Sequence, residues 1–169
     1  MVLVALGSNL GHAGFGSPLA TCQAAVAALI ERGTSVLALS RWYRTAPVPA
    51  SDQPWYVNGV ALVDSALGPD ALLERLHAIE AAFGRVRRER NEARCLDLDL
   101  LAWGDRIMPG PQAPILPHPR LHQRAFVLRP LLDIAPDWRH PLLGRSAREL
   151  ARELPPDQVT TVIADDGQA

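Results

Sequence analysis

The sequence predicts an α+β fold in which helices cover one face of an antiparallel sheet. Four short runs are apolar or alternate between apolar and polar residues, as strands do, and two longer stretches between them have helical periodicity. Their order is β-α-β-β-α-β, the order of the ferredoxin-like split βαβ arrangement, and extra helical segments follow near the C-terminus. The 169 residues suit one domain, 1–169, and we expect the tail from about residue 155 to be loosely ordered.

The first part of the chain contains a predicted strand, helix and strand. Residues 2–6 form a continuous apolar run, which predicts a buried strand. Four glycines within 7–16 predict a loop. A helix over 17–32 begins with a serine cap followed by proline, and a glycine ends it. Residues 34–44 are rich in β-formers and predict one strand.

The second part repeats the pattern. Three prolines predict a loop over 45–54, and the alternating residues 56–64 predict another strand. Residues 69–83 have an apolar stripe at helical spacing, and Gly84 ends that helix. The remaining predicted elements are an arginine-rich loop over 85–94, a strand over 96–103, an irregular proline-rich segment over 104–119 and short helices over 124–132 and 146–153.

Composition excludes several classes of protein. The net charge of −1 gives no overall attraction to nucleic acid or to a membrane surface. No apolar run reaches the roughly 18 residues of a membrane span, and the N-terminus lacks the pattern of a secretory signal. Cys22 and Cys95 match no metal-binding spacing. We therefore expect a cytoplasmic protein with no nucleic-acid or membrane partner. We also expect a monomer.

All 17 basic residues are arginine, so the chain contains no lysine. A P-loop needs a lysine that reaches the β- and γ-phosphates of the nucleotide. The protein-kinase site also depends on a lysine. The sequence therefore excludes both of these common ATP-binding designs.

The pair Asp97 and Asp99 is the sharpest chemical signal. In a strand, alternate residues share a face, so the two carboxylates point the same way and the leucines beside them point into the core. Adjacent carboxylates repel unless a cation lies between them, and magnesium is held by one or two carboxylates together with substrate phosphates. A solvated face of an edge strand remains the alternative explanation.

The loop before this strand concentrates positive charge. Five of the 17 basic residues lie within ten positions, at Arg85, Arg87, Arg88, Arg90 and Arg94. Guanidinium groups match phosphate oxygens in bidentate geometry. Arginines beside paired aspartates are what a metal-polyphosphate complex requires, although a charge run is more often only solvated surface.

Two further segments are candidates for the same site. His118 and Arg124 would add phosphate donors if their loop folds toward Asp97, with a ring at Phe126 nearby. Tyr56 and Asn58 share one face of their strand, and a ring with an amide suits a flat heterocycle. A plain turn, a helix start and an exposed tyrosine would explain the same residues.

Several motifs occur together in a fixed order along residues 4 to about 136. They are Gly7-Ser8-Asn9-Leu10, Tyr43-Arg44-Thr45, Asp52-Gln53-Pro54 with Tyr56 and Asn58, Gly84-Arg85-Val86-Arg87, Arg94-Cys95-Leu96-Asp97-Leu98-Asp99, Pro117-His118-Pro119-Arg120 and Arg124-Ala125-Phe126. In this order they resemble the 6-hydroxymethyl-7,8-dihydropterin pyrophosphokinase family of folate biosynthesis. The two-aspartate strand with its preceding arginine is specific, whereas the glycine motif alone is weak.

The resemblance implies a reaction and a set of roles. The enzyme would transfer pyrophosphate from ATP to the hydroxymethyl group of the reduced pterin and release AMP, with two magnesium ions held by Asp97 and Asp99. The implied catalytic residues are Arg85, Arg94, Asp97 and Asp99. The implied nucleotide contacts are Glu80, Arg87, Arg88, His118 and Arg124. The implied pterin contacts are Thr45, Val48, Tyr56, Asn58 and Phe126. Asp99 is the preferred residue to accept the proton of the attacking hydroxyl or to orient that hydroxyl.

The chain departs from the family at some positions. Asn91 stands where the family often has a tryptophan in the arginine loop, and Arg88 stands where a lysine can occur. Two other functions stay open from sequence alone: a non-enzymatic ferredoxin-like module that binds a small regulatory ligand, and an RNA-binding domain of the same fold. The second expects a basic face with sheet aromatics, which an aromatic content of 5% and the net charge do not favour.

Overall fold

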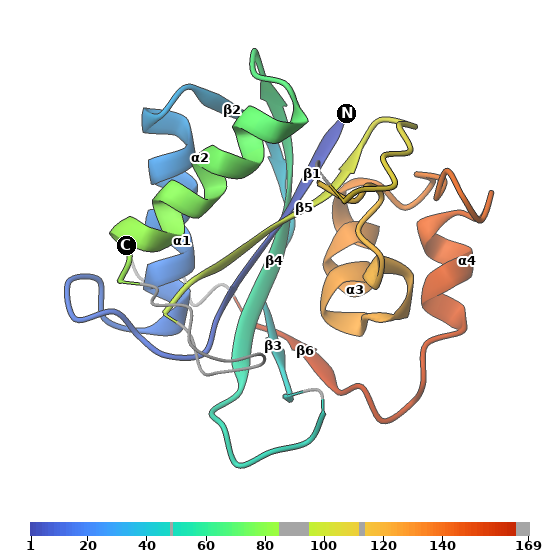
Figure 1. Cartoon of the computed structure of the whole chain (residues 1–169). Coiled ribbons are helices and arrows are strands. Elements are labelled where there is room, and N and C mark those ends of the chain that lie inside the picture. Colours follow the sequence, from blue (N-terminus) through green and yellow to red (C-terminus); the bar gives the residue numbers. More distant parts are fainter. Residues whose placement is uncertain (48, 85–94, 112–113, 165–169) are drawn as a thin grey trace.

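Within residues 1–47, 49–84, 95–111 and 114–164, which the computed structural model describes, six strands form one antiparallel sheet (Figure 1). In chain order the elements are β1 (Val2–Ser8), α1 (Pro18–Glu31), β2 (Thr34–Leu39), β3 (Tyr43–Thr45), β4 (Tyr56–Ser65), α2 (Pro69–Ala82), β5 (Asp97–Trp103), the 3-10 helix η1 (Leu121–Gln123), α3 (Ala125–Ile134), α4 (Ala147–Arg152) and β6 (Thr160–Val162). β1 lies between β5 and β4; β4 also pairs with β2 and β3, and β6 pairs with β3. The predicted α+β class and antiparallel sheet are confirmed.

Helices cover both faces of the sheet. The sequence predicted helices on one face, with the other face either covered by loops and the C-terminal region or left open for a ligand. Figure 1 shows α1 and α2 on one side and α3 and α4 on the other. Two buried cores result, one under each helical layer. The C-terminal helices are therefore the cover of the second face of the sheet.

The central strand β1 contributes side chains to both cores. All seven of its residues are buried. Val4 and Leu6 belong to the core under α1 and α2, while Leu3 and Ala5 belong to the core under α3 and α4. This division follows from the two-residue period of a strand, and it explains why the sequence shows a continuous apolar run here.

Local signals set several of the helix ends, as the sequence predicted. The Ser17 hydroxyl accepts a hydrogen bond from the Ala20 N–H at 3.2 Å and caps α1, and Gly33 follows its C-terminus with φ of 81°. Gly84 follows α2 with φ of 77°. Ser146 and Glu149 form a capping box at the start of α4. Among the described helices, none is long and apolar enough to cross a membrane.

The prediction of one strand over 34–44 was wrong, because the chain breaks into β2 and β3. The Ser40 hydroxyl accepts from the Val60 N–H at 2.9 Å, and the Ser40 N–H donates to the Val60 carbonyl at 2.9 Å. Three residues, 40–42, therefore lie opposite two on β4, between the pairs Leu39↔Ala61 and Tyr43↔Asn58. Such an extra residue interrupts a ladder in the manner of a β-bulge.

The strand β6 was not predicted from the sequence. This strand pairs with β3 through Thr45↔Thr160, Arg44↔Thr161 and Tyr43↔Val162. The Ala46 N–H also donates to the Val159 carbonyl at 3.2 Å. The strand is three residues long and partly exposed, so its sequence has no hydrophobic alternation to reveal it. It satisfies backbone groups that would otherwise be unpaired along β3.

Asp133 of α3 ties the second helical layer to the strand region around β3. Its carboxylate accepts hydrogen bonds from the Arg41 backbone N–H at 3.1 Å and from the Tyr43 hydroxyl at 3.0 Å. The Arg41 guanidinium donates to the same carboxylate at 2.6 Å. Tyr43 is buried, so this contact gives its hydroxyl a partner and adds a polar link between α3 and the sheet to the apolar packing of the second core.

Replacing this carboxylate should destabilise the fold. Asp133→Ala removes the acceptor of a partly buried tyrosine hydroxyl and of a backbone N–H, and we expect a loss of about 1–3 kcal/mol in the free energy of unfolding. Urea denaturation measures this change. Asp137→Ala is the matched control, because the Asp137 side chain is 89% exposed beside Arg148, and we expect a change within about 0.5 kcal/mol. Equal losses in the two variants would contradict this assignment.

Candidate active site

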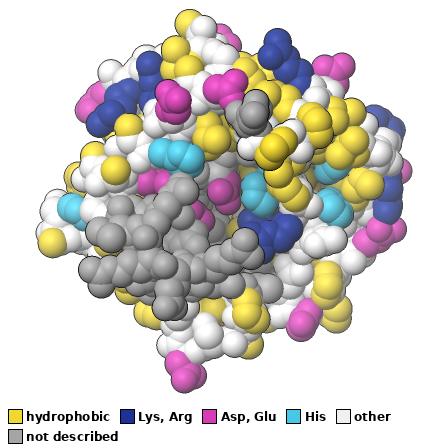
Figure 2. All heavy atoms as spheres, in the orientation of Figure 1, with side chains coloured by type: hydrophobic (Ala, Val, Ile, Leu, Met, Phe, Trp, Pro, Cys, Tyr) yellow, Lys and Arg dark blue, Asp and Glu magenta, His cyan; other side chains and the backbone are white. Residues whose placement is uncertain are grey.

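A cavity of about 1450 Å³ opens between the sheet and the N-terminal end of α3. Figure 2 shows acidic, histidine and arginine side chains gathered around a hollow on this face. The predicted site residues that line the cavity are Thr45, Tyr56, Asn58, Glu80, Asp97, Asp99, His118, Arg124 and Phe126. The predicted site residues Val48, Arg85, Arg87, Arg88 and Arg94, and the departure at Asn91, lie outside the described residues.

The register of the sheet brings the predicted residues of two distant strands together. Gly7 of β1 pairs with Asn58 on one side and with Asp97 on the other. A Cβ added at Gly7 would lie 2.6 Å from the Asn58 side-chain oxygen, closer than atoms can pack. Glycine at this position therefore leaves room for the floor of the cavity between a carboxylate and an amide.

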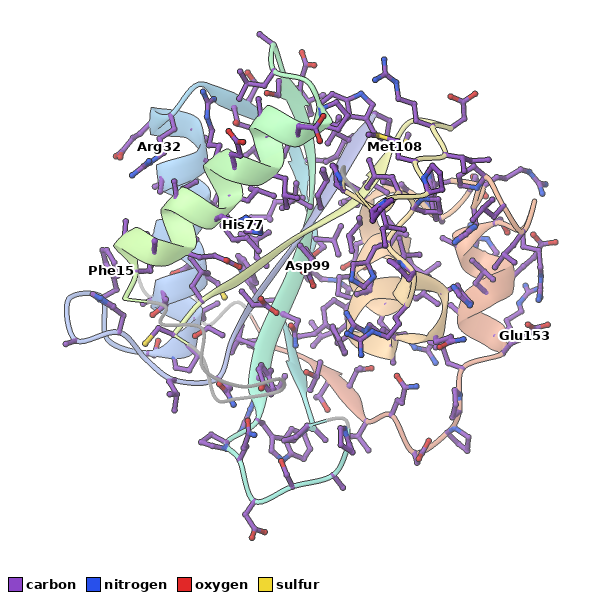
Figure 3. All side chains as sticks on the ribbon, in the orientation of Figure 1. Phe15, Arg32, His77, Asp99, Met108 and Glu153 are labelled. Carbon is purple, nitrogen blue, oxygen red and sulfur yellow. The ribbon has the colours of Figure 1, made fainter. Side chains whose placement is uncertain are left out.

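Asp97 and Asp99 lie on one face of β5, as the alternation predicted. Both are half-buried and line the cavity, while Leu98 and Leu100 between and beside them are buried in the core under α2. Figure 3 labels Asp99 on β5 and His77 on α2, and both side chains contribute to the cavity wall. The two carboxylates are thus held by a strand whose other face is anchored in the core.

The N-terminal end of α3 supplies a cation and a ring. Arg124 is the N-cap residue, and its Nη1 lies 3.8 Å from Asp99 Oδ2. The Arg124 guanidinium lies 5.2 Å from the centre of the Phe126 ring. The guanidinium is therefore placed by a carboxylate and by an aromatic face, with Phe126 beside it in the cavity wall.

His118 enters the cavity wall as a neutral imidazole. Burial, reinforced by the positive charges of Arg124 and Arg120, lowers the pKa of His118 to about 4, against an opposing effect of the Asp97 carboxylate. The Arg120 N–H donates to His118 Nδ1 at 3.2 Å. Because Nδ1 accepts this bond, the proton of the neutral ring resides on Nε2, which makes Nε2 a hydrogen-bond donor at neutral pH.

A polar group at the other end of the cavity is prearranged by hydrogen bonds. The Asn58 amide donates to the Thr45 hydroxyl at 2.6 Å, and both side chains are buried. The Tyr56 hydroxyl donates to Gln53 Oε1 at 3.2 Å, and Gln53 also accepts from the Asn9 amide at 3.1 Å. Asn58 and Tyr56 are two residues apart on β4 and face the cavity together.

Glu80 is a buried carboxylate with a structural contact. Its side chain is only 2% exposed, and its Oε1 accepts from the Leu98 N–H at 2.7 Å. β5 is the edge strand of the sheet, so this N–H points away from β1. Glu80 thereby gives an acceptor to the outward N–H of Leu98, the residue between the two aspartates. The same hydrogen bond links the C-terminal end of α2 to β5.

The oxygen donors fit a magnesium ion that is shared with a substrate. Within the part of the chain that the structure describes, no three His, Cys, Asp or Glu side chains come together to hold a metal. Asp97 and Asp99 nonetheless offer two carboxylates on one face of the cavity. Magnesium uses one or two carboxylates and completes its coordination with water and phosphate oxygens, so this donor set suits it.

Sequence reasoning missed the contribution of the C-terminal part to the cavity. Residues of η1, of the segment before α4, of α4 and of the segment after it line the cavity beside the predicted ones. They are His122, Gln123, Leu143, Arg145, Leu150, Glu153, Leu154, Pro155 and Gln158. The capping box at Ser146 predicts that α4 exists, but no local signal indicates which face of the sheet it covers.

Comparisons with known proteins agree on one family. The family model of 7,8-dihydro-6-hydroxymethylpterin-pyrophosphokinase (HPPK) matches residues 3–136. A 2-amino-4-hydroxy-6-hydroxymethyldihydropteridine pyrophosphokinase of Pseudomonas aeruginosa is 45% identical over 156 residues, covering 91% of this chain and 91% of the relative. The protein of that name from Synechocystis sp. is 40% identical over 153 residues, covering 90% of this chain and 75% of the relative.

Solved structures show the same fold. Wild-type Plasmodium falciparum HPPK-DHPS with STZ-DHP has a TM-score of 0.70 and 13% sequence identity. The match covers 89% of this chain and 42% of that chain, so the present chain spans less than half of that structure. At this identity the likeness concerns the fold alone.

The contact between Glu80 and β5 generates a testable prediction. Glu80→Ala leaves the buried Leu98 N–H without its acceptor, and we expect a loss of about 1–3 kcal/mol in the free energy of unfolding. Glu80→Gln is the matched variant, because its amide oxygen still accepts the bond and should retain most of the stability. Thermal and urea denaturation of the two variants measure the difference. A glutamine variant as unstable as the alanine variant would show that the backbone contact is unimportant.

Proposed function

Because the chain belongs to the 7,8-dihydro-6-hydroxymethylpterin-pyrophosphokinase family, we propose that it transfers pyrophosphate from ATP to the hydroxymethyl group of 6-hydroxymethyl-7,8-dihydropterin. The products are AMP and the pterin diphosphate, an intermediate of folate biosynthesis. The single observation that carries the mechanism is the pair of half-buried carboxylates, Asp97 and Asp99, on one wall of a cavity that also contains an arginine and a prearranged amide. A charged end and an aromatic end of one cavity suit a polyphosphate and a flat heterocycle.

The phosphate end of the proposed site is built around Asp97 and Asp99. When bound there, magnesium supplies charge neutralisation between the triphosphate and the attacking hydroxyl. Arg124 offers forked donors beside Asp99, and neutral His118 offers its Nε2–H. Arg85, Arg87, Arg88 and Arg94, the phosphate ligands expected from the family resemblance, lie in sequence between α2 and β5, and we propose that they complete this end.

The pterin end of the proposed site is apolar on its faces and polar at its edge. We assign Tyr56 and Phe126 to the two faces of the ring, with the Asn58 amide at its edge. The hydrogen bond from Asn58 to Thr45 supports this assignment, because it fixes the amide before a ligand arrives. Val48 is proposed to add a contact from the same loop.

The proposed reaction is an in-line displacement at the β-phosphorus. The hydroxymethyl oxygen forms a bond to that phosphorus, the bond from the β-phosphorus to the α–β bridging oxygen breaks, and AMP leaves with the bonding pair. The proton of the hydroxyl group passes to the Asp99 carboxylate or to water. The protein contributes mainly orientation and neutralisation of charge, as in other phosphoryl transfers.

The proposal also covers the fold type, the number of domains, the oligomeric state and the cellular location. The strands β5-β1-β4-β2, in that spatial order, with α1 and α2 on one face, support classification of this part as ferredoxin-like. The sheet joins β1 near the N-terminus to β6 near the C-terminus, which supports one domain. A monomeric cytoplasmic protein is proposed. The alternative of a non-enzymatic regulatory module is not favoured, because the named relatives are pyrophosphokinases.

The nucleotide product tests this function directly. With ATP, magnesium and 6-hydroxymethyl-7,8-dihydropterin, we expect one AMP for each pterin diphosphate formed, because attack occurs at the β-phosphorus. Anion-exchange chromatography separates AMP from ADP. Formation of ADP, or release of AMP without a modified pterin, would rule out the proposed transfer.

The carboxylate pair generates the second prediction of this mechanism. Asp97→Asn and Asp99→Asn preserve side-chain size and remove a negative charge, and we expect each to lower kcat/KM by about a hundredfold or more. Circular dichroism should remain unchanged, because the core contacts of β5 come from its leucines. Asp64→Asn, at an exposed carboxylate of β4, is the matched control and should retain activity. Wild-type rates in both site variants would exclude these carboxylates from the reaction.

A further inference from the structure

A C-terminal segment, residues 155–162, joins two walls of the cavity, and we call this segment the strap. Its end forms β6 and pairs with β3, where Thr160 is opposite Thr45. The Val159 carbonyl accepts from the Ala46 N–H at 3.2 Å. On this side the strap therefore holds the backbone next to Thr45, which belongs to the proposed pterin end. The strap lies beyond residue 136, where the family match ends.

On its other side the strap reaches α3 through one side chain. Gln158 Oε1 accepts from the Ala125 N–H at 2.7 Å, and Gln158 Nε2 donates to the Gln123 carbonyl at 2.9 Å. Ala125 is the first residue of α3, and the first N–H groups of a helix have no acceptor within the helix. The N-cap residue Arg124 makes no side-chain capping bond, so Gln158 supplies the cap from a distant part of the chain.

The capped residue lies directly between the two site residues of α3. Arg124 precedes Ala125 and contacts Asp99, while Phe126 follows it and lies in the cavity wall. A shift of the Ala125 backbone would move both side chains, whereas the sheet side of the cavity would stay fixed. Gln158 also lines the cavity, so the bond between the strap and α3 is made at the site itself.

We infer that Gln158 is a positioning residue for the pterin site: through the Ala125 N–H it sets the distance of Phe126 and Arg124 from the sheet wall that carries Tyr56, Asn58 and Thr45. This inference rests on the proposed function. It assigns to Gln158 no contact with the reacting atoms. The C-terminal strap is thereby part of the recognition of the heterocycle, since it holds both walls between which the ring is proposed to bind.

Three variants of the full chain test the inference. Gln158→Met keeps the length and bulk of the side chain and removes both hydrogen bonds. Gln158→Glu keeps an oxygen that accepts from the Ala125 N–H and adds a negative charge, which a helix N-terminus favours. Its lost donation to the Gln123 carbonyl is at an exposed position, where water can replace it. Thr161→Ala, at an exposed residue of β6, controls for general disturbance of the strap.

The measurement is calorimetric titration of 6-hydroxymethylpterin into each variant, with magnesium and α,β-methylene ATP present, at a temperature where circular dichroism shows every variant folded. We expect Gln158→Met to raise the pterin Kd about tenfold, the scale of one lost partly buried hydrogen bond. Gln158→Glu should stay within about threefold of wild type, and Thr161→Ala should equal wild type. A residue important only for stability would not change affinity in the folded protein.

The outcomes separate this inference from the proposed function. If wild type forms no AMP, the proposed function fails and the inference fails with it. If wild type forms AMP and Gln158→Met binds the pterin as wild type does, only the inference is overturned. Should Gln158→Met not fold, Gln158→Glu still decides, because tenfold weaker pterin binding by this variant would overturn the role of the Ala125 bond.

Discussion

A strand covered on both faces must present apolar side chains in both directions, and this constraint on β1 organises the molecule. Leu3 and Ala5 pack under α3 and α4, while Val4 and Leu6 pack under α1 and α2. This alternation of apolar side chains ends at Gly7. Because Gly7 has no side chain, space is left at this point on the face that α3 and α4 cover. The cavity begins where the central strand no longer supplies a side chain, and its neighbours on β4 and β5 there are polar.

β5 and β3, two strands that border the cavity, are completed on their outer sides by groups from other elements. On β5, the buried Glu80 of α2 accepts a hydrogen bond from the outward N–H of Leu98, which no neighbouring strand could accept. On β3, the strand β6 supplies a backbone partner. Both edges border the cavity, and an unsatisfied edge would be open to water at the site. Glu80 itself lines the cavity, and β6 pairs with the strand that carries Thr45 of the cavity wall.

Structure could be predicted from the sequence where it depends on neighbouring residues, as in strand alternation and helix capping. The β5 alternation placed Asp97 and Asp99 on one face, and the caps at Ser17 and Gly33 located α1. It did not reveal the break at Ser40, because that break depends on hydrogen bonds to Val60 on another strand. The short strand β6 and the docking of α4 depend likewise on long-range contacts that leave no periodic signal. Resemblance to a family supplied the roles of the residues, which geometry alone does not assign.

In the proposed site, negatively charged and positively charged side chains come from different parts of the chain. The chain has a net charge of −1, yet residues 85–94 contain five arginines and two glutamates. The sheet wall contributes carboxylates, and the neutral state of His118 avoids another positive charge beside Arg124. A metal-polyphosphate has both cationic and anionic parts, so it requires carboxylates on a rigid wall and guanidinium groups opposite them.

The rigid wall is the strand β5, which its leucines anchor in the core. The guanidinium of Arg124, by contrast, lies at a helix end that another segment must cap. Precise placement of the proposed metal ligands Asp97 and Asp99 therefore comes from the core, and placement of Arg124 comes from the C-terminal part of the chain.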